Sequence, residues 1–111
     1  MKLFHTDISS KWNSLTIFEQ MANIGAEVGR SINWRNKNNS EISKNAFYRA
    51  LELVDFTIAD KKNMNLLGEI CRMREVLVDF FAGDNIYHSK DNDWEKYFYH
   101  FNFAARAKKN G

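Results

Sequence analysis

The chain contains no proline, and this absence constrains its fold more than any other single feature. Proline interrupts helices because its ring removes a backbone donor and clashes with the preceding turn. Apolar residues here recur every three or four positions over long stretches, which is the period of one helix face. The first stretch covers residues 17–36, and Thr16 just before it has the spacing of a capping box with Glu19 in its first turn. The sequence therefore predicts an all-helical protein.

Four segments follow this helical pattern, separated by loops rich in asparagine, aspartate and glycine. The predicted helices span residues 17–36, 41–59, 64–82 and 94–108. Ser40 is the expected cap of the second helix, and Gly83 is the expected end of the third. Because the connections are short, neighbouring helices should run antiparallel. We predict an all-α, antiparallel up-and-down four-helix bundle, preceded at residues 1–13 by a flexible arm or a short extra helix.

The third predicted helix is apolar around most of its circumference, so we expect it at the centre of the bundle. It contains Cys71, the only cysteine, which cannot form an intramolecular disulfide and is interpreted as a small buried hydrophobe. On the first helix, Gly25 and Gly29 lie near Ala22 and Ala26. Such small side chains allow another helix to approach closely.

Length and composition describe an ordinary globular protein. The length of 111 residues suits one domain covering 1–111. A content of 44% hydrophobic and 27% charged residues argues against disorder. The net charge of +2 lacks the basic excess of a dedicated nucleic-acid binder. The N-terminus has no signal-peptide core, and no apolar run approaches the roughly 20 residues that span a bilayer. We therefore expect a cytoplasmic protein with no membrane partner.

Three histidines are scattered over the chain, at His5 in a tail, His88 in a loop and His100 in a helix. None has a partner at the spacing of metal ligands, such as one helical turn away. We therefore expect no metal site and no cofactor.

Four charged side chains interrupt the apolar third helix: Arg72, Arg74, Glu75 and Asp79. Arg72 and Asp79 share a helix face, and Glu75 neighbours both. Because charged groups are seldom buried unless they are paired, two interpretations are open. The cluster is either an ion-pair network that locks the helix to its neighbours, or a polar pocket or dimer-interface site. In both cases Asp79 is the expected acceptor for Arg72, and Arg74 should reach another helix or subunit.

This run also resembles the signature of HEPN domains, small helical bundles of prokaryotic toxin and nucleotidyltransferase systems. Arg74 matches the signature arginine, Glu75 the polar position after it, and Phe81 a frequent aromatic position. Asp79 stands where the family has a histidine that is thought to carry out acid–base chemistry on RNA. An aspartate is normally ionised at neutral pH and holds a leaving-group proton poorly. We therefore do not expect ribonuclease activity. The wider chain also looks like short uncharacterised prokaryotic proteins.

The resemblance implies a non-enzymatic, HEPN-like module that forms a homodimer and binds a protein, a nucleotide or RNA. In that family, dimers commonly form through the helices that bear the arginine motif. The 14% aromatic content fits an apolar interface as well as a core. Two alternatives are an atypical HEPN-type ribonuclease of a toxin–antitoxin system, acting through Arg72, Arg74 and Asp79, and a subunit of a nucleotidyltransferase system.

Overall fold

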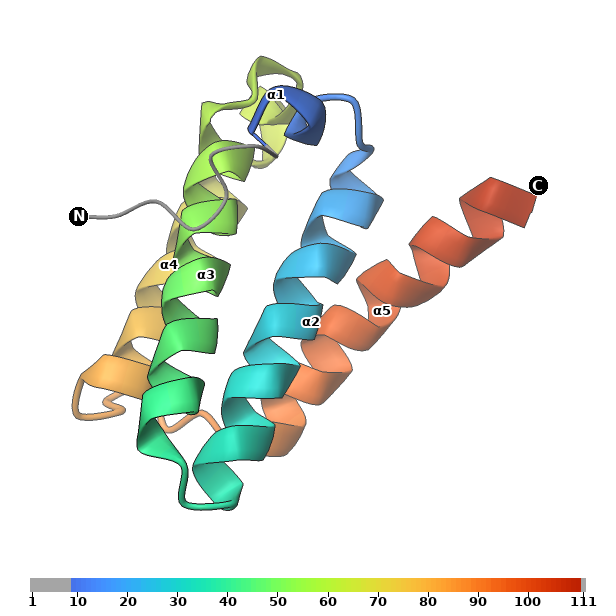
Figure 1. The fold of residues 1–111 in the computed structure, drawn as a ribbon. Helices are drawn as coiled ribbons and strands as arrows, with labels where there is room; N and C mark the ends of the chain where they lie inside the picture. Colours follow the sequence, from blue (N-terminus) through green and yellow to red (C-terminus); the bar gives the residue numbers. More distant parts are fainter. Residues whose placement is uncertain (1–8, 111) are drawn as a thin grey trace.

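The computed structural model describes residues 9–110, with side chains described for residues 11–107. The elements in chain order are α1 (Ser9–Trp12), α2 (Ile17–Asn36), α3 (Ser40–Ala59), the 3₁₀ helix η1 (Lys61–Leu66), α4 (Leu67–Ala82) and α5 (Asp91–Asn110). The four long helices run alternately in opposite directions (Figure 1), and residues 9–110 contain no strand. The predicted all-α, antiparallel up-and-down four-helix bundle is confirmed.

The N-terminal segment is described only from Ser9 onward, so most of the predicted arm lies outside the described residues. Trp12, near the end of that segment, is 1% exposed and belongs to the hydrophobic core. The interpretation of residues 1–13 as a flexible arm is therefore wrong for Trp12, whose large apolar surface is covered by the bundle.

Local sequence sets the ends of the helices. The predicted capping box is formed, because Thr16 Oγ1 accepts the Glu19 N–H at 3.1 Å and Glu19 Oε1 accepts the Thr16 N–H at 3.0 Å. Asn39, rather than the expected Ser40, caps α3 by accepting a backbone N–H of its first turn at 3.1 Å. Asparagine and serine cap helices about equally well, so the sequence left this choice open. Gly83 follows the end of α4, as predicted.

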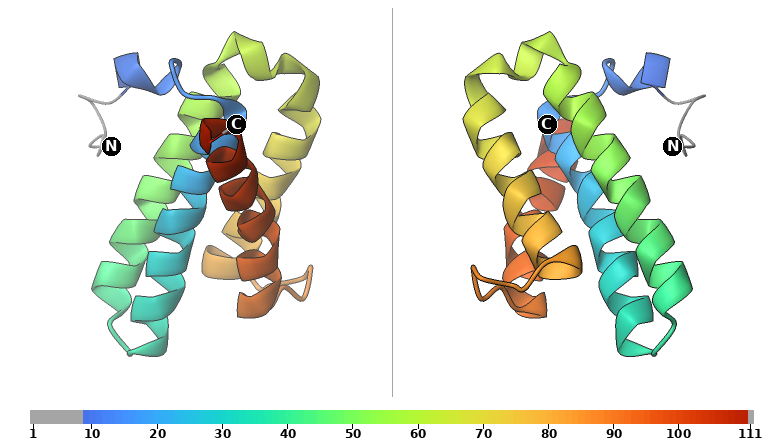
Figure 2. Two further views of the ribbon diagram at one scale, coloured as in Figure 1. Left: turned by 90° about the vertical axis from the view of Figure 1, so that its right-hand side faces the viewer. Right: turned by 90° about the vertical axis from the view of Figure 1, so that its left-hand side faces the viewer.

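The central helix is α2. It packs against both α3 and α5, whereas α4 packs mainly against α3. The prediction that the third long helix lies at the centre is wrong, since α4 buries only Ile70, Met73 and Leu77 fully. Figure 2 shows that α4 stays close to α3 near η1 and separates from it toward the other end. Part of its apolar circumference therefore faces a groove instead of the core.

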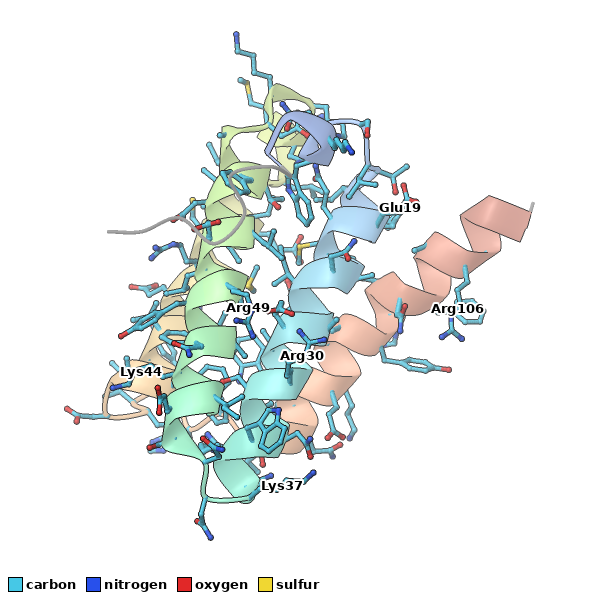
Figure 3. The ribbon with its side chains drawn as sticks, viewed as in Figure 1. Glu19, Arg30, Lys37, Lys44, Arg49 and Arg106 are labelled. Carbon is cyan, nitrogen blue, oxygen red and sulfur yellow. The ribbon has the colours of Figure 1, made fainter. Side chains whose placement is uncertain are left out.

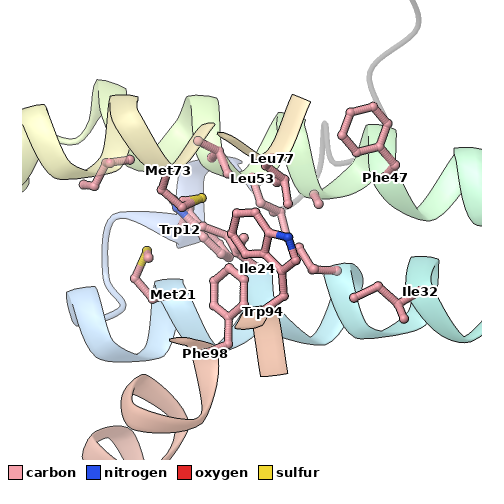
Figure 4. Packing of buried hydrophobic residues seen from close by; sticks show 14 residues of the cluster. Trp12, Met21, Ile24, Ile32, Phe47, Leu53, Met73, Leu77, Trp94 and Phe98 are labelled. Carbon is pink, nitrogen blue, oxygen red and sulfur yellow. The ribbon is translucent and has the colours of Figure 1, made fainter. Parts of the chain in front are cut away.

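Aromatic residues of α5 hold that helix on α2. Trp94 and Phe98 are 5% and 6% exposed and lie in the core with Ile24 and Leu77 (Figure 4). Gly25 permits this packing, because a Cβ atom built there would lie 2.7 Å from Cβ of Phe98. The close approach that the sequence predicted for the small residues of α2 thus occurs at Gly25.

Buried polar side chains close one end of the bundle. Gln20 is fully buried, and its Nε2 donates to the Trp12 carbonyl at 3.0 Å and to Asp60 Oδ2 at 2.9 Å. Its Oε1 accepts from Asn63 Nδ2 at 2.8 Å, and Trp12 Nε1 donates to Thr57 Oγ1 at 2.9 Å. A buried amide left unsatisfied costs about 1–3 kcal/mol, whereas these groups find partners. This network joins α1, α2, the end of α3 and η1.

The network also explains where α4 begins. The predicted third helix starts at residue 64, but the chain forms η1 first and becomes α-helical at Leu67. Asp60 caps η1 by accepting the Lys62 N–H at 3.2 Å, and Asn63 is drawn inward to Gln20. The local Asp60 cap and the long-range Asn63–Gln20 hydrogen bond together favour the tighter turn over an earlier start of the α-helix.

A mostly buried carboxylate connects the middle of α2 to α3. Glu27 is 8% exposed, its Oε2 accepts from Arg49 Nε at 2.7 Å, and it also pairs with Arg30. Figure 3 shows Arg30 and Arg49 extending from neighbouring helices. Such a carboxylate needs charged partners to offset its loss of water, so this pairing fixes the register of the two helices.

The two glycines of α2 provide a matched test of this packing. We expect Gly25→Ala to lower the free energy of unfolding by about 1–3 kcal/mol, because the added methyl group overpacks against Phe98. A Cβ atom at Gly29 meets nothing within 4 Å. Gly29→Ala should therefore raise the free energy of unfolding by about 0.5–1 kcal/mol through better helix propensity. Urea denaturation of both variants measures the difference, and equal effects at the two positions would contradict the Gly25–Phe98 contact.

Asp60 makes the stability of this network depend on pH. Burial alone would raise the pKa of its carboxyl group, but hydrogen bonds from Lys62 and Gln20 outweigh this effect and hold the pKa below its ordinary value. Its stabilising contribution is therefore present above the unfolded-state pKa of about 3.9 and is lost as the pH falls through the folded-state pKa. We expect the free energy of unfolding to fall more steeply below about pH 4 in the wild type than in Asp60→Asn, as measured by urea denaturation at a series of pH values. Identical pH profiles would exclude this role.

Candidate functional site

Arg74, the best match to the HEPN signature, reaches from α4 to α3. Its Nε donates to Asp55 Oδ1 at 2.8 Å, and its Nη2 donates to Asp55 Oδ2 at 3.5 Å. Both side chains are partly in solvent, 36% and 54% exposed, so the pair contributes only about 0–1 kcal/mol. Arg74 therefore acts as a surface tie between two helices.

The carboxylate of Asp79 organises the loop between α4 and α5. Oδ1 accepts the Ile86 N–H at 2.9 Å and Oδ2 accepts the Tyr87 N–H at 3.1 Å. The main-chain carbonyl of Asp79 also accepts the Asn85 N–H at 3.1 Å. The expectation that Asp79 pairs with Arg72 is wrong, because both carboxylate oxygens are engaged by the backbone donors of this loop. Asp79 is thus the anchor of a tight turn.

The remaining residues of the predicted cluster stay apart from one another. Arg72 and Glu75 are exposed and form no ion pair among the described residues. No two of the four predicted site residues pair together, so the expected Arg72–Glu75–Asp79 network is not formed. Cys71 is also exposed, which corrects its interpretation as a buried hydrophobe: it lies on the outer side of α4.

An open groove lies between α4 and the beginning of α5. Its volume is about 340 Å³, within the range of small-molecule sites. Met73 and Val76 of α4 and Trp94 and Tyr97 of α5 give it a mainly apolar lining. The polar members of the lining are Glu69, Arg72, Ser89 and Asp93. Arg72 is the one predicted site residue that reaches this groove.

Two hydrogen-bonding groups of the groove residues are left without partners. Trp94 Nε1 and the Tyr97 hydroxyl are both buried, and neither finds a hydrogen-bond partner among the described residues. Buried polar groups in native proteins are usually hydrogen-bonded, and each exception needs an explanation. Both residues line the same groove, but the two polar atoms are themselves covered, so a hydrogen-bond acceptor bound in the groove reaches them only after neighbouring side chains move.

The protonation of Tyr97 suits it to donate a hydrogen bond. Burial and the nearby Glu69 carboxylate raise the pKa of Tyr97 to about 12. Its hydroxyl therefore keeps its proton throughout the neutral range. The indole N–H of Trp94 can only donate. Both groups are consequently hydrogen-bond donors whose protonation does not change in the physiological pH range.

The side chains that line this groove include no histidine, cysteine or lysine, and its titratable members are Glu69, Arg72, Asp93 and Tyr97. The backbone of Ser89 is held by Asn85, which accepts the Ser89 N–H at 2.9 Å and donates to the Ser89 carbonyl at 3.0 Å. Asp79 and Asn85 together thus shape the loop that places Ser89 at the groove.

The sequence pattern did not reveal this site, because aromatic residues at helical spacing ordinarily indicate residues of the hydrophobic core. Trp94 and Tyr97 are one turn apart and belong to the apolar stripe of the fourth predicted helix. Their polar atoms are the available signal, since buried tryptophan and tyrosine usually place these atoms against an acceptor. Nothing in the sequence shows that the acceptor is missing, because that depends on how α4 packs.

The described part of the chain shows neither a cluster of metal ligands nor a helix suited to span a membrane. Among residues 11–107, no group of three or more histidine, cysteine, aspartate or glutamate side chains is arranged to hold a metal ion. None of the described helices combines the length and apolar character needed to cross a lipid bilayer. Comparison with protein-family models, curated proteins and solved structures found no match to this chain. The groove between α4 and α5 is therefore the feature of this protein that points to a function.

Because Asp79 and Arg74 have different roles, replacing each by alanine should lower the free energy of unfolding by different amounts. We expect Asp79→Ala to lower the free energy of unfolding by about 1.5–3 kcal/mol, since two charge-assisted hydrogen bonds to the loop are lost. Arg74→Ala should cost no more than about 1 kcal/mol, because its ion pair is exposed. Asp79→Asn keeps one acceptor and should fall between them. Urea denaturation gives the order, and a larger loss for Arg74→Ala would contradict these roles.

Proposed function

We propose that this protein is a non-enzymatic binding module, HEPN-like in its helical architecture, whose ligand occupies the groove between α4 and α5. The observation that carries the proposal is the pair of unpartnered buried groups, Trp94 Nε1 and the Tyr97 hydroxyl, at one groove. The preferred ligand is an uncharged apolar group that carries a carbonyl or a similar acceptor. The apolar part packs on Met73 and Val76, and the acceptor pairs with the two covered donors when neighbouring side chains of the groove move aside.

The charges of the lining support an uncharged ligand. Glu69 and Asp93 are acidic and Arg72 is basic, so the groove presents both signs. An anionic group near Arg72 would also meet the two carboxylates, which disfavours phosphate. A hydrogen-bonding site rejects an analogue without the acceptor, because the buried donors then stay unpaired. Selection in this groove therefore depends on the acceptor and on shape.

The positions of the motif residues support binding over RNA cleavage. Arg74 is paired with Asp55 on α3, and the carboxylate of Asp79 is committed to the loop backbone. A general acid or base must reach the proton that it transfers, and these two side chains are directed to different parts of the structure. The ribonuclease alternative has less physical support than the binding module.

Tryptophan side-chain NMR signals provide a direct test. The chain has three tryptophans, of which Trp12 already donates to Thr57 and Trp94 lacks a partner. We expect uncharged aromatic amides, such as benzamide and acetanilide, to shift the Trp94 indole N–H signal downfield on titration. The Trp12 signal should stay unchanged, because its hydrogen bond is already made. Trp94→Phe identifies the signal and should weaken amide binding about tenfold, since it removes the donor and keeps an aromatic ring.

Hydrocarbon analogues such as ethylbenzene provide the control for shape. They should bind the wild type more weakly than the amides do. They should bind Trp94→Phe and Tyr97→Phe about as well as they bind the wild type. If amides leave the Trp94 signal in place, or bind the two variants as well as they bind the wild type, the groove is not the proposed acceptor site.

A further inference from the structure

One face of α5 is directed away from the α4–α5 groove and carries large apolar side chains in solvent. Tyr99 and Phe103, one turn apart, are each 63% exposed. Glu95 and Arg106 lie on this same face, because eleven residues make about three turns of an α-helix. Isolated exposed apolar residues are ordinary, but two aromatic side chains between opposite charges form a surface suited to a partner.

The charges on this face are complementary to themselves. Glu95 and Arg106 are both exposed and form no ion pair among the described residues. If a second α5 lies antiparallel across the midpoint between them, each Glu95 is opposite the Arg106 of the other copy. The same operation brings Tyr99 and Phe103 of the two copies toward the centre of the contact. A two-fold interface requires one patch that matches itself, and this face meets that requirement.

The neighbouring surface of α2 leaves space for such an approach. A hollow of about 320 Å³ lies between α2 and α5, with Ala26 and Gly29 on one side and Glu95 and Tyr99 on the other. It is continued by a second hollow of about 300 Å³ that includes Arg106. The C-terminal half of α5 also diverges from α2 (Figure 1). The hollowed strip therefore follows the same face of α5 from Glu95 to Arg106.

We propose that this protein forms a homodimer through antiparallel pairing of α5 with α5 of a second copy, with two Glu95–Arg106 ion pairs at its ends. The exposed aromatic residues Tyr99 and Phe103 supply its apolar centre. This surface is separate from the proposed ligand groove, so the inference goes beyond the proposed function. It also differs from pairing through the arginine-bearing helix, which the HEPN resemblance implies and which would involve α4.

Charge reversal tests this arrangement. Glu95→Lys alone, or Arg106→Glu alone, puts like charges at both ends of a homodimer, so each should raise the dimer Kd by about tenfold or more. When the two single variants are mixed, every contact again joins opposite charges. The mixture should therefore form dimers at concentrations at which each variant alone is monomeric. Sedimentation velocity over a concentration series measures all three samples.

Two exposed positions on other helices provide matched controls. Lys44→Glu on α3 reverses a charge on the side of the bundle away from Arg106 (Figure 3), and it should leave the Kd unchanged. Glu75→Lys on α4 should also leave it unchanged. Dissociation by Glu75→Lys with no effect at Glu95 and Arg106 would place the interface on α4 and overturn the proposal. A wild type that is monomeric at every concentration, or variants that do not associate on mixing, would overturn it as well.

Discussion

The contact between Phe98 and Gly25 is the constraint on which the functional surfaces of this protein depend. The Phe98 ring occupies the space that a side chain at position 25 would need, and it seats α5 directly on α2. Trp94, one turn earlier, is brought into the core by the same contact. One flank of α5 then borders the groove beside α4, and another borders the hollows beside α2. Both proposed binding surfaces thus follow from the position of one helix.

The opposite anchor is the polar network around Gln20, which controls α4 instead of α5. Its hydrogen bonds to Asp60 and Asn63 fix η1, and η1 determines where α4 leaves the end of α3. The two anchors act on different helices, so α4 and α5 are each held by the α2–α3 pair more than by each other. A groove between them is the consequence. The two walls also meet at one point, where the rings of Phe80 on α4 and Trp94 on α5 lie 6.1 Å apart.

Much of the fold could be predicted from the sequence, but less of the site. The four long helices, their antiparallel order and the Thr16–Glu19 capping box all depend on residues close together in the chain, and the structure has each of them. The partners of Asp79 could not be predicted in this way. Spacing along a helix made Arg72 its expected partner, but a helix neighbour competes with backbone donors of the following loop, which offer two hydrogen bonds. The position of a side chain on a helix face shows which partners it could pair with. The fold of the neighbouring loop decides which of them it does pair with.

The sequence by itself determined which segments are helical and which of their faces are apolar, because both follow from the local period of side chains along the chain. Only the tertiary structure decided which apolar face is covered. α4 has the apolar circumference of a central helix, yet α2 takes the centre because Gly25 allows α5 to pack closely against it. The same holds for Trp94 and Tyr97. Their place in an apolar stripe is a local property, whereas the lack of an acceptor for their polar atoms depends on helices distant in sequence that leave a groove beside them.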